Sequence, residues 1–328
     1  MRNKMSRVLS VLFIFIFAAS FTSCSGGTSN VPTAVTVGNV EVGSDIYAYY
    51  LDTVLQNSDE SLKEDDAKKQ AEQLCANYIK INTAFKEMKL SLSSATKSDL
   101  AIDVNNLWNI FGKYYDSIGV TKQTLTKIKE SEAYREELIS ALYDKGGEKE
   151  ISEEEQKNYF NSNYVFFKAI SSYLYTTDSE GRAVALPENE LNEIKNSFNS
   201  MKSQINETNT IDAVNKAYED SNGGSAESEM PVLSTVKGSD EYPEKFFSDV
   251  SAMQNGEIQV FTYDNYIFLV RKEDGSSFYS DYAKTNLSSM AGDDFNKWLE
   301  SKYADVKISA DRGTENSCYN LIQRAKTH

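Results

Sequence analysis

The side chains that carry out nucleophilic or metal-dependent catalysis are scarce in this sequence. Its single histidine, His328, is the final residue, so an internal Ser-His-Asp or Cys-His arrangement is absent. Its three cysteines, Cys24, Cys75 and Cys318, form no CxxC pair and no cluster with histidine, which disfavours redox and zinc chemistry. No phosphate-binding glycine loop with a lysine occurs either. We therefore predict neither a metal site nor a cofactor.

Carboxylates are the remaining candidates for acid, base or metal-ligand roles, and they occur in runs. The runs are Asp65-Asp66, Glu153-Glu154-Glu155 and Asp293-Asp294. Their spacing matches neither a calcium loop nor the carboxylate pair of a glycosidase, whereas helix first turns and solvated helix faces commonly carry such residues. The 49 Asp and Glu residues outnumber the 34 Lys and Arg residues and give a formal net charge of -15. This charge argues against nucleic acid as a partner and against docking on anionic lipid by charge.

The start of the chain has the pattern of a secretion signal. Three basic residues precede an apolar run at residues 8–19, which is short for a membrane span. The stretch Phe21-Thr22-Ser23-Cys24 resembles a bacterial lipobox, with Phe21 where leucine is usual. The resemblance implies cleavage before Cys24 and lipidation of that residue, so that residues 1–23 are the signal peptide and residues 24–33 a flexible tether. An ordinary secretory signal or an uncleaved anchor is the alternative.

This signal also bears on location and on the two remaining cysteines. We expect the protein to act outside the cytoplasm, anchored through lipid to the bacterial cell membrane. Such a location permits a disulfide between Cys75 and Cys318. However, Cys75 lies in a helical pattern with Leu74 and Tyr78, which favours a buried free thiol. The sequence leaves the redox state of the pair open.

The elements that must position any site are two strands among many helices. Residues 165–176 and 259–271 are rich in β-branched and aromatic residues and predict two core strands. Residues 34–42 alternate around Gly38-Asn39 and predict a hairpin, and a further strand is expected at residues 306–309. Helical spacing predicts helices near residues 43–51 (N-cap Ser44 or Asp45), 61–88, 98–115, 121–143, 152–163, 187–205, 210–218, 243–253 and 277–303. The final stretch, residues 311–328, is predicted to be a polar tail, and its last ten or so residues are predicted to be frayed.

This order of elements resembles extracytoplasmic foldases of the SurA and PrsA type. Val35-Thr36-Val37-Gly38-Asn39-Val40 resembles the hairpin that opens those proteins, and Asn163-Tyr164-Val165 the entry to their parvulin domain. Asn255-Gly256-Glu257-Ile258 is similar to the approach to that domain's closing strand, and residues 294–308 to the family's last helix and strand. The resemblance implies an α+β fold in which a helical chaperone body, built from both ends of the chain, carries an inserted parvulin-like module of β-α-α-α-β type. The implied units are residues 34–162 (N-terminal helical chaperone domain), 163–274 (parvulin-like domain), 275–310 (C-terminal helix returning to the body) and 311–328 (tail).

Parvulins are peptidyl-prolyl cis/trans isomerases, and members of the family usually place one histidine on the first strand and one on the last. The matching positions here are Ala169 or Ser171 on the first strand and Tyr266, with Asn265 as a neighbouring choice, on the last. The module is therefore expected to be degenerate, its catalytic residues are unknown, and the resemblance leaves isomerase activity open. Side chains that could line a residual proline pocket are Met230, Phe246, Phe247 and Tyr266; for the first three, a place in the core is the alternative.

The sequence therefore predicts a membrane-anchored extracytoplasmic chaperone or foldase. Its expected partners are unfolded or newly secreted polypeptides, held weakly and at several points, and its acidic character favours basic clients. The abundance of aromatic residues, with 20 Tyr and 16 Phe, suits contacts with unfolded chains wherever some of them are exposed. An active prolyl isomerase is the first alternative. A structural surface lipoprotein that binds one fixed partner is the second.

Overall fold

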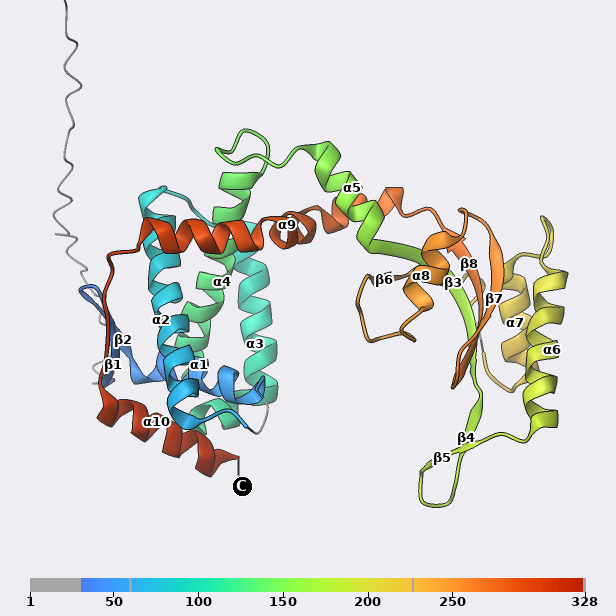
Figure 1. Cartoon of the computed structure of the whole chain (residues 1–328), viewed down its shortest axis with the longest axis horizontal. Coiled ribbons are helices and arrows are strands. Elements are labelled where there is room, and N and C mark those ends of the chain that lie inside the picture. The colour runs from blue at the N-terminus through green and yellow to red at the C-terminus, as the bar shows by residue number, and fades with distance from the viewer. Residues whose placement is uncertain (1–30, 59–60, 226, 327–328) are drawn as a thin grey trace, which may run out of the picture.

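The chain folds into a mixture of helices and strands, as predicted (Figure 1). The computed structural model describes residues 31–58, 61–225 and 227–326. The predicted signal peptide, most of the tether, the predicted lipidation site Cys24 and the single histidine His328 lie outside the described residues. Within the described ranges, no helix combines the length and the apolar character needed to cross a membrane.

A helical body is built from both ends of the chain, as Figure 1 shows. Its helices are α1 (Ser44–Gln56), α2 (Glu64–Glu87), α3 (Ser94–Ser117), α4 (Lys122–Tyr143), α9 (Tyr279–Lys302) and α10 (Arg312–Ala325). Its small sheet consists of β1 (Thr33–Val37), β2 (Val40–Gly43) and β9 (Ile308–Ala310) in the order β2-β1-β9. Because Thr36 of β1 lies opposite Ser309 of β9, the sheet joins the two ends directly.

The last helix corrects one prediction. The tail expected to be frayed forms α10, whose N-cap Asp311 accepts a hydrogen bond from the backbone N–H of Thr314. Cys318 and Ile322 are buried against the core of α1 and α2. A polar segment with apolar residues at i and i+4 can form an amphipathic helix. Packing of the apolar side of this helix against the core orders the segment.

Local signals at the helix starts were mostly read correctly. Thr121 caps α4 by accepting from the N–H of Thr124, and Ser152 and Glu155 form a capping box at the start of α5. The expected side-chain cap of α1 was wrong, because its N-cap is Gly43 and makes no side-chain cap. The N–H of Ser44 instead donates to the carbonyl of Pro32 at 2.7 Å, since β2 leads straight into the helix.

The middle of the chain forms a second unit around a four-stranded antiparallel sheet. Its main strands are β3 (Tyr164–Tyr173), β6 (Leu233–Val236), β7 (Ile258–Thr262) and β8 (Tyr266–Glu273), in the order β6-β3-β8-β7. Its helices are α5 (Glu153–Asn163), α6 (Glu188–Gln204), α7 (Ile211–Ser221) and α8 (Phe246–Ala252), followed by the 3-10 turn η1 (Ser276–Phe278). The short strands β4 (Tyr175–Thr177) and β5 (Ala183–Ala185) extend from the end of β3.

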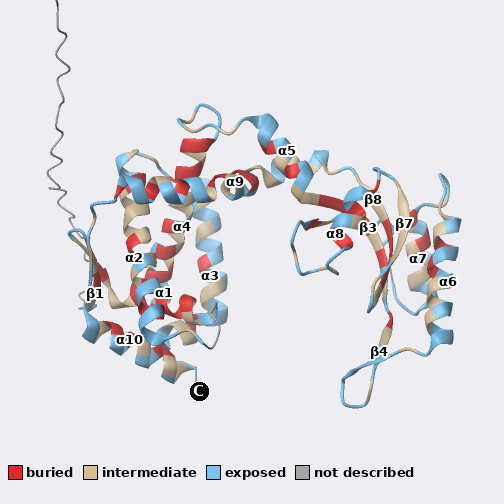
Figure 2. Cartoon of the chain, viewed as in Figure 1, coloured by how far each residue is buried: buried red, intermediate tan, exposed pale blue. Residues whose placement is uncertain are grey.

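Alternating side chains give this sheet a separate core on each face. On one face, Ile170 and Leu269 pack against Phe198 of α6 and Val214 of α7. The other face packs against α8 through a second set of apolar side chains. They are Val165, Phe167, Phe268 and Val270 of the strands with Phe246 and Val250 of the helix. Figures 1 and 2 show α6 and α7 on one side of the sheet and α8 on the other, with buried residues along the strands between them.

The predicted strand pair needed three corrections. The stretch 259–271 is not one strand but the hairpin β7–β8, because the N–H of Tyr263 donates to the carbonyl of Tyr266 at 2.8 Å across a tight turn. The stretch 165–176 divides at Leu174 into β3 and β4. Strand β6 was missed, since its four residues are too short to show an alternating pattern and are held only by pairing with β3.

Aromatic rings pack where the two units meet. The ring of Phe160 on α5 lies 5.7 Å from that of Tyr282 on α9, and the ring of Tyr164 lies 4.8 Å from Tyr282. Phe166 of β3 stacks on Phe278 at 5.0 Å. Such ring contacts add stability beyond the area that they bury, so α5 and α9 connect the units through packed side chains as well as through the chain.

Candidate functional site

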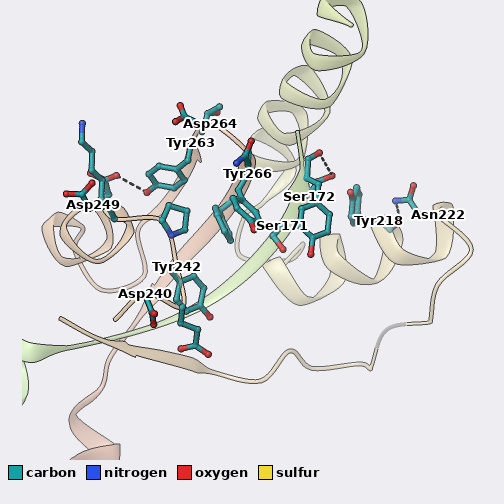
Figure 3. A pocket seen from close by; sticks show the side chains of 18 of the residues that line it. Ser171, Ser172, Tyr218, Asn222, Asp240, Tyr242, Asp249, Tyr263, Asp264 and Tyr266 are labelled. Carbon is teal, nitrogen blue, oxygen red and sulfur yellow. Dashed lines mark hydrogen bonds between the residues drawn. The ribbon is translucent and has the colours of Figure 1, made fainter. Parts of the chain in front are cut away.

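An open cleft of about 1140 Å³ lies at the end of the sheet where β3 ends and β8 begins (Figure 3). Four segments that are distant in sequence line it: the end of β3, the end of α7, the loop before α8, and the turn between β7 and β8. In Figure 3, Tyr266 lies at its centre, with Tyr263 and Asp249 on one side and Tyr218 on the other. The cleft is large enough to take several side chains of a ligand, because its volume is slightly above the usual range for small-molecule binding sites.

Aromatic rings line much of the cleft. They are Tyr173, Tyr218, Tyr242, Tyr263, Tyr266 and Phe268. Tyr266 lies directly opposite Tyr173 in the β3–β8 register, with ring centroids 5.4 Å apart, and it stacks on Phe268 at 5.9 Å. The strand period of two places Tyr266 and Phe268 on the same face, so neighbouring rings form one continuous surface.

Carboxylates surround this aromatic surface. The acidic lining residues are Glu219, Asp240, Glu241, Glu244, Asp249 and Asp264, and Lys245 is the single basic residue among the described residues that line the cleft. The hydroxyl of Tyr263 donates to Asp249 at 2.8 Å. Burial, followed by this hydrogen bond and the Asp249 charge, raises the pKa of Tyr263, so the phenol stays protonated at neutral pH. A concentration of negative charge beside tyrosine faces favours cationic side chains, through both charge attraction and cation–π contact.

The structure places only some of the predicted histidine-equivalent positions in this cleft. Ser171 and Tyr266 both line it. Ser171, however, is opposite Phe268, and Ala169 is opposite Val270, so neither pairs directly with Tyr266. The residue directly across from Tyr266 is Tyr173, which the sequence analysis did not select. Ala169 lines a neighbouring hollow of about 780 Å³ instead.

The residues expected to line a proline pocket are dispersed. Phe246 is completely buried between the sheet and α8, so it belongs to the core. Phe247 lines a separate hollow of about 340 Å³, and Met230 lines the hollow that contains Ala169. Of these candidates, Tyr266 alone lines the large cleft. The proline-pocket residues therefore do not come together in the structure.

On the face of the sheet that α6 and α7 cover, a buried ion pair holds the loop that follows α7. The Lys168 ammonium lies 2.9 Å from Asp212 at the start of α7, and Asp212 also accepts from the N–H of Met230 at 2.8 Å. Burial by itself would raise the pKa of Asp212, but these two hydrogen bonds and the lysine charge outweigh it and lower the pKa. The lysine thus connects β3, α7 and the chain entering β6.

The helical body offers a second exposed surface along α3. Ile102, Ile110 and Phe111 are exposed, Ile110 at 71%, and only Val104 and Gly112 of this helix are buried. A hollow of about 890 Å³ beside Leu107 and Ile110 adjoins this surface. Figures 1 and 2 show α3 at the side of the body that faces the sheet unit. Exposed apolar side chains beside a hollow commonly mark an interaction site.

Most residues of the cleft were not predicted from the sequence. The loop Asp240-Glu241-Tyr242-Pro243-Glu244 carries the densest group of them, and its mixture of acids and an aromatic residue before a helix was a visible signal. The sequence does not show that this loop lines the same cleft as the turn at Asp264 and the end of α7, because these segments are far apart in the chain.

Comparison with known proteins gives matches among solved structures alone. No family model matches the chain, and no curated protein matches it. The foldase PrsA of Lactococcus lactis is 12% identical with a TM-score of 0.41, over 89% of this chain and 99% of that one. PrsA of Streptococcus pneumoniae is 16% identical with a TM-score of 0.35, over 80% and 98%. A structure from work on the SurA-like chaperones PEB4 and Cj1289 of Campylobacter jejuni is 11% identical with a TM-score of 0.31, over 85% and 99%. These proteins are of the type that the sequence resembles.

Proposed function

We propose that this protein is an extracytoplasmic protein-folding factor that holds unfolded or newly secreted polypeptides. The observation that carries the proposal is the open cleft with its tyrosine surface and six carboxylates: Glu219, Asp240, Glu241, Glu244, Asp249 and Asp264. Tyrosine rings contact many different side chains, so they suit clients of varied sequence. The carboxylates favour the client segments that carry lysine or arginine.

The α3 surface supports the same function. Two separate weak sites on one molecule bind a long chain more tightly than either does alone, because the second contact becomes intramolecular. The exposed apolar side chains Ile102, Ile110 and Phe111 suit apolar client segments, while the cleft suits basic and aromatic ones. A client that spans both would be kept from aggregating without being held in one structure.

The proposal includes the anchor and the domain organisation. Cleavage before Cys24 and lipidation of that residue would hold the protein at the outer side of the bacterial cell membrane, with the tether at residues 24–33. Residues 163–274 would be a degenerate parvulin-like module, and residues 34–162 with 275–310 the chaperone body. The antiparallel strand order β6-β3-β8-β7 supports the module, and the lack of an internal histidine supports its degeneracy. Incorporation of labelled fatty acid that a Cys24→Ala variant loses would test the anchor.

The decisive experiment measures aggregation of chemically unfolded clients, one basic and one acidic, with the full chain present. We expect suppression to be stronger for the basic client and weaker at high salt, since exposed charges are screened. The triple variant Asp240→Asn, Glu241→Gln, Glu244→Gln should lose much of the protection of the basic client. The matched control is Glu188→Gln, Glu190→Gln, Glu193→Gln on the exposed face of α6, which removes the same charge elsewhere.

Two results would overturn the proposal. The first is that the full chain neither binds an unfolded client nor slows its aggregation. The second is capture of one stoichiometric partner in place of many clients, which would favour a structural lipoprotein. If both triple variants protect the basic client as the natural chain does, the chaperone function stands but the cleft is not its site.

A further inference from the structure

Strand β3 is longer than the strand beside it, and this leaves part of its edge unpaired. On one side, β8 pairs with β3 from Phe166 to Tyr173. On the other, β6 pairs from Tyr164 to Phe167, where the pairing ends opposite Leu233. Residues 168–173 therefore have a strand partner on one side, and on the other no strand of the described chain pairs with them, so we call this edge open.

The direction of each backbone group follows from two hydrogen bonds at the ends of β3. The N–H of Leu174 donates to Asn265 on the β8 side, and the carbonyl of Asn163 accepts from Lys237 on the β6 side. In an antiparallel strand, successive residues direct their N–H and C=O to opposite neighbours. The groups of Ala169, Ser171 and Tyr173 thus point out of the open edge, whereas those of Ile170 and Ser172 bond to β8.

These outward groups are available to a ligand. Among the described residues, none donates to or accepts from the outward backbone groups of Ala169 and Ser171. The carbonyl of Tyr173 has a long contact of 3.4 Å with the hydroxyl of Ser172, and its N–H has no such partner in the described chain. Tyr173 is 57% exposed, so the edge is accessible from solvent.

Pro231 explains why β6 stops short. If the β3–β6 register continued, Pro231 would lie opposite Ala169. Proline has no N–H to donate and is confined to the margins of sheets. The next residue back, Met230, donates its N–H to Asp212 instead, at 2.8 Å, so the chain turns towards α7.

The open edge lies between two hollows. Ser171, Ser172 and Tyr173 line the acidic cleft, and Ala169 lines the hollow of about 780 Å³. Glu219 of α7 lines both of them. An extended segment along the edge would therefore have space for its side chains and carboxylates within reach.

We propose that this edge binds an extended segment of a client polypeptide as an added β-strand, with lysine or arginine side chains directed to the surrounding carboxylates. Main-chain hydrogen bonds provide affinity that does not depend on sequence, and the flanking acids select basic segments. A second copy of this chain fits less well, because it would bring the same carboxylates against one another. The inference rests on the proposed chaperone function and specifies how a client is held.

Amide hydrogen exchange, read residue by residue on the full chain, tests the proposal. The probe is an eight-residue peptide that alternates lysine with valine or tyrosine. In the free protein, Ala169, Ser171 and Tyr173 should exchange at least tenfold faster than Ile170 and Ser172. Saturating peptide should slow these three amides at least tenfold and leave the other two unchanged. Peptide binding without this alternating protection would overturn the proposal.

Two control peptides and one further measurement make the outcome specific. The same sequence with every amide N-methylated cannot pair as a strand and should bind at least tenfold more weakly. Glutamate in place of lysine should weaken binding similarly through charge. Sedimentation that shows a dimer, with the three amides already protected without peptide, would make a second copy the occupant and refute the proposal. Unchanged suppression of client aggregation alongside a negative exchange result would refute this binding mode alone.

Discussion

The ion pair between Lys168 and Asp212 allows a quantitative test of how the sheet unit is held together. The Lys168 side chain is 7% exposed and that of Asp212 is 18% exposed, so Asp212→Asn leaves a largely buried ammonium without its carboxylate. Breaking a buried pair by removing one partner costs about 3–5 kcal/mol. We expect a cost of about 3 kcal/mol, at the lower end of this range, because the Glu229 carboxylate lies 3.7 Å from the ammonium and replaces part of the lost attraction. This replacement is only partial, since Glu229 is 84% exposed to solvent.

The substitution to asparagine isolates the charge. The asparagine oxygen can still accept the N–H of Met230, so the backbone contact is retained. Adding Lys168→Met removes the orphaned charge and keeps a long apolar side chain, and buried ion pairs replaced by apolar groups are often close to neutral. The double variant should therefore lie within about 1 kcal/mol of the natural chain.

The positions of the two tryptophans make the assay selective. Trp108 and Trp298 lie on α3 and α9, so tryptophan fluorescence during urea unfolding reports on the helical body. Amide exchange at Ile170, in the core of β3, reports on the sheet unit. A loss of about 3 kcal/mol should speed exchange at Ile170 by about 150-fold, at 1.36 kcal/mol per tenfold change. The urea midpoint from fluorescence should stay the same.

Acid should reproduce part of this effect. The pKa of Asp212 is lower in the folded chain than its ordinary value of about 3.9. Its contribution to stability is therefore complete above about pH 4 and is lost as the pH falls through the lower folded value. The Asp212→Asn variant lacks this particular acid dependence. The reasoning fails if the single substitution costs less than about 1 kcal/mol, or if the double variant is no more stable than the single one.

Three further outcomes are expected. In a protease-coupled assay on a proline peptide, the full chain should not exceed the spontaneous rate, because none of the described residues that line the cleft is a histidine. Acceleration that Tyr266→Ala abolishes would show an active isomerase. Ile322→Ala should cost the helical body about 3 kcal/mol, since Ile322 of α10 is fully buried against the core of α1 and α2. A fluorescence-detected loss below about 1 kcal/mol would contradict the packing. Cys75 and Cys318 should resist alkylation at pH 8 until urea unfolds the chain. The reason is that burial raises the pKa of Cys318 to about 11 and raises the pKa of Cys75 as well. Rapid labelling of the native protein, detected by mass spectrometry, would refute this expectation.

Local sequence was sufficient for most helices and for the first hairpin. The capping box at Ser152 and Glu155, the cap at Thr121 and the turn at Gly38 each involve residues within three or four positions of one another. Helical periodicity likewise depends on residues one or two turns apart. Such features form from interactions that a short peptide already contains, so they can be predicted without knowing the rest of the fold.

Segments that depend on distant partners were predicted less well. Strand β6 exists because it pairs with β3, and α10 is ordered because Cys318 and Ile322 pack on the first helices. Neither segment carries enough local preference to specify its structure. Short strands and polar amphipathic helices gain their stability from tertiary packing, which a reading by periodicity does not include.

The sequence by itself determined that this chain has an acidic, aromatic-rich composition, an α+β pattern and no internal histidine. Only the tertiary structure decided that Tyr266 lies opposite Tyr173, that Phe246 is core, and that six carboxylates from separate segments surround one cleft. It also decided that β3 has an unpaired edge, because Pro231 and the bond from Met230 to Asp212 end the neighbouring strand. Composition and periodicity are properties of a chain read in order, whereas a cleft and an open edge depend on which distant segments the fold brings together.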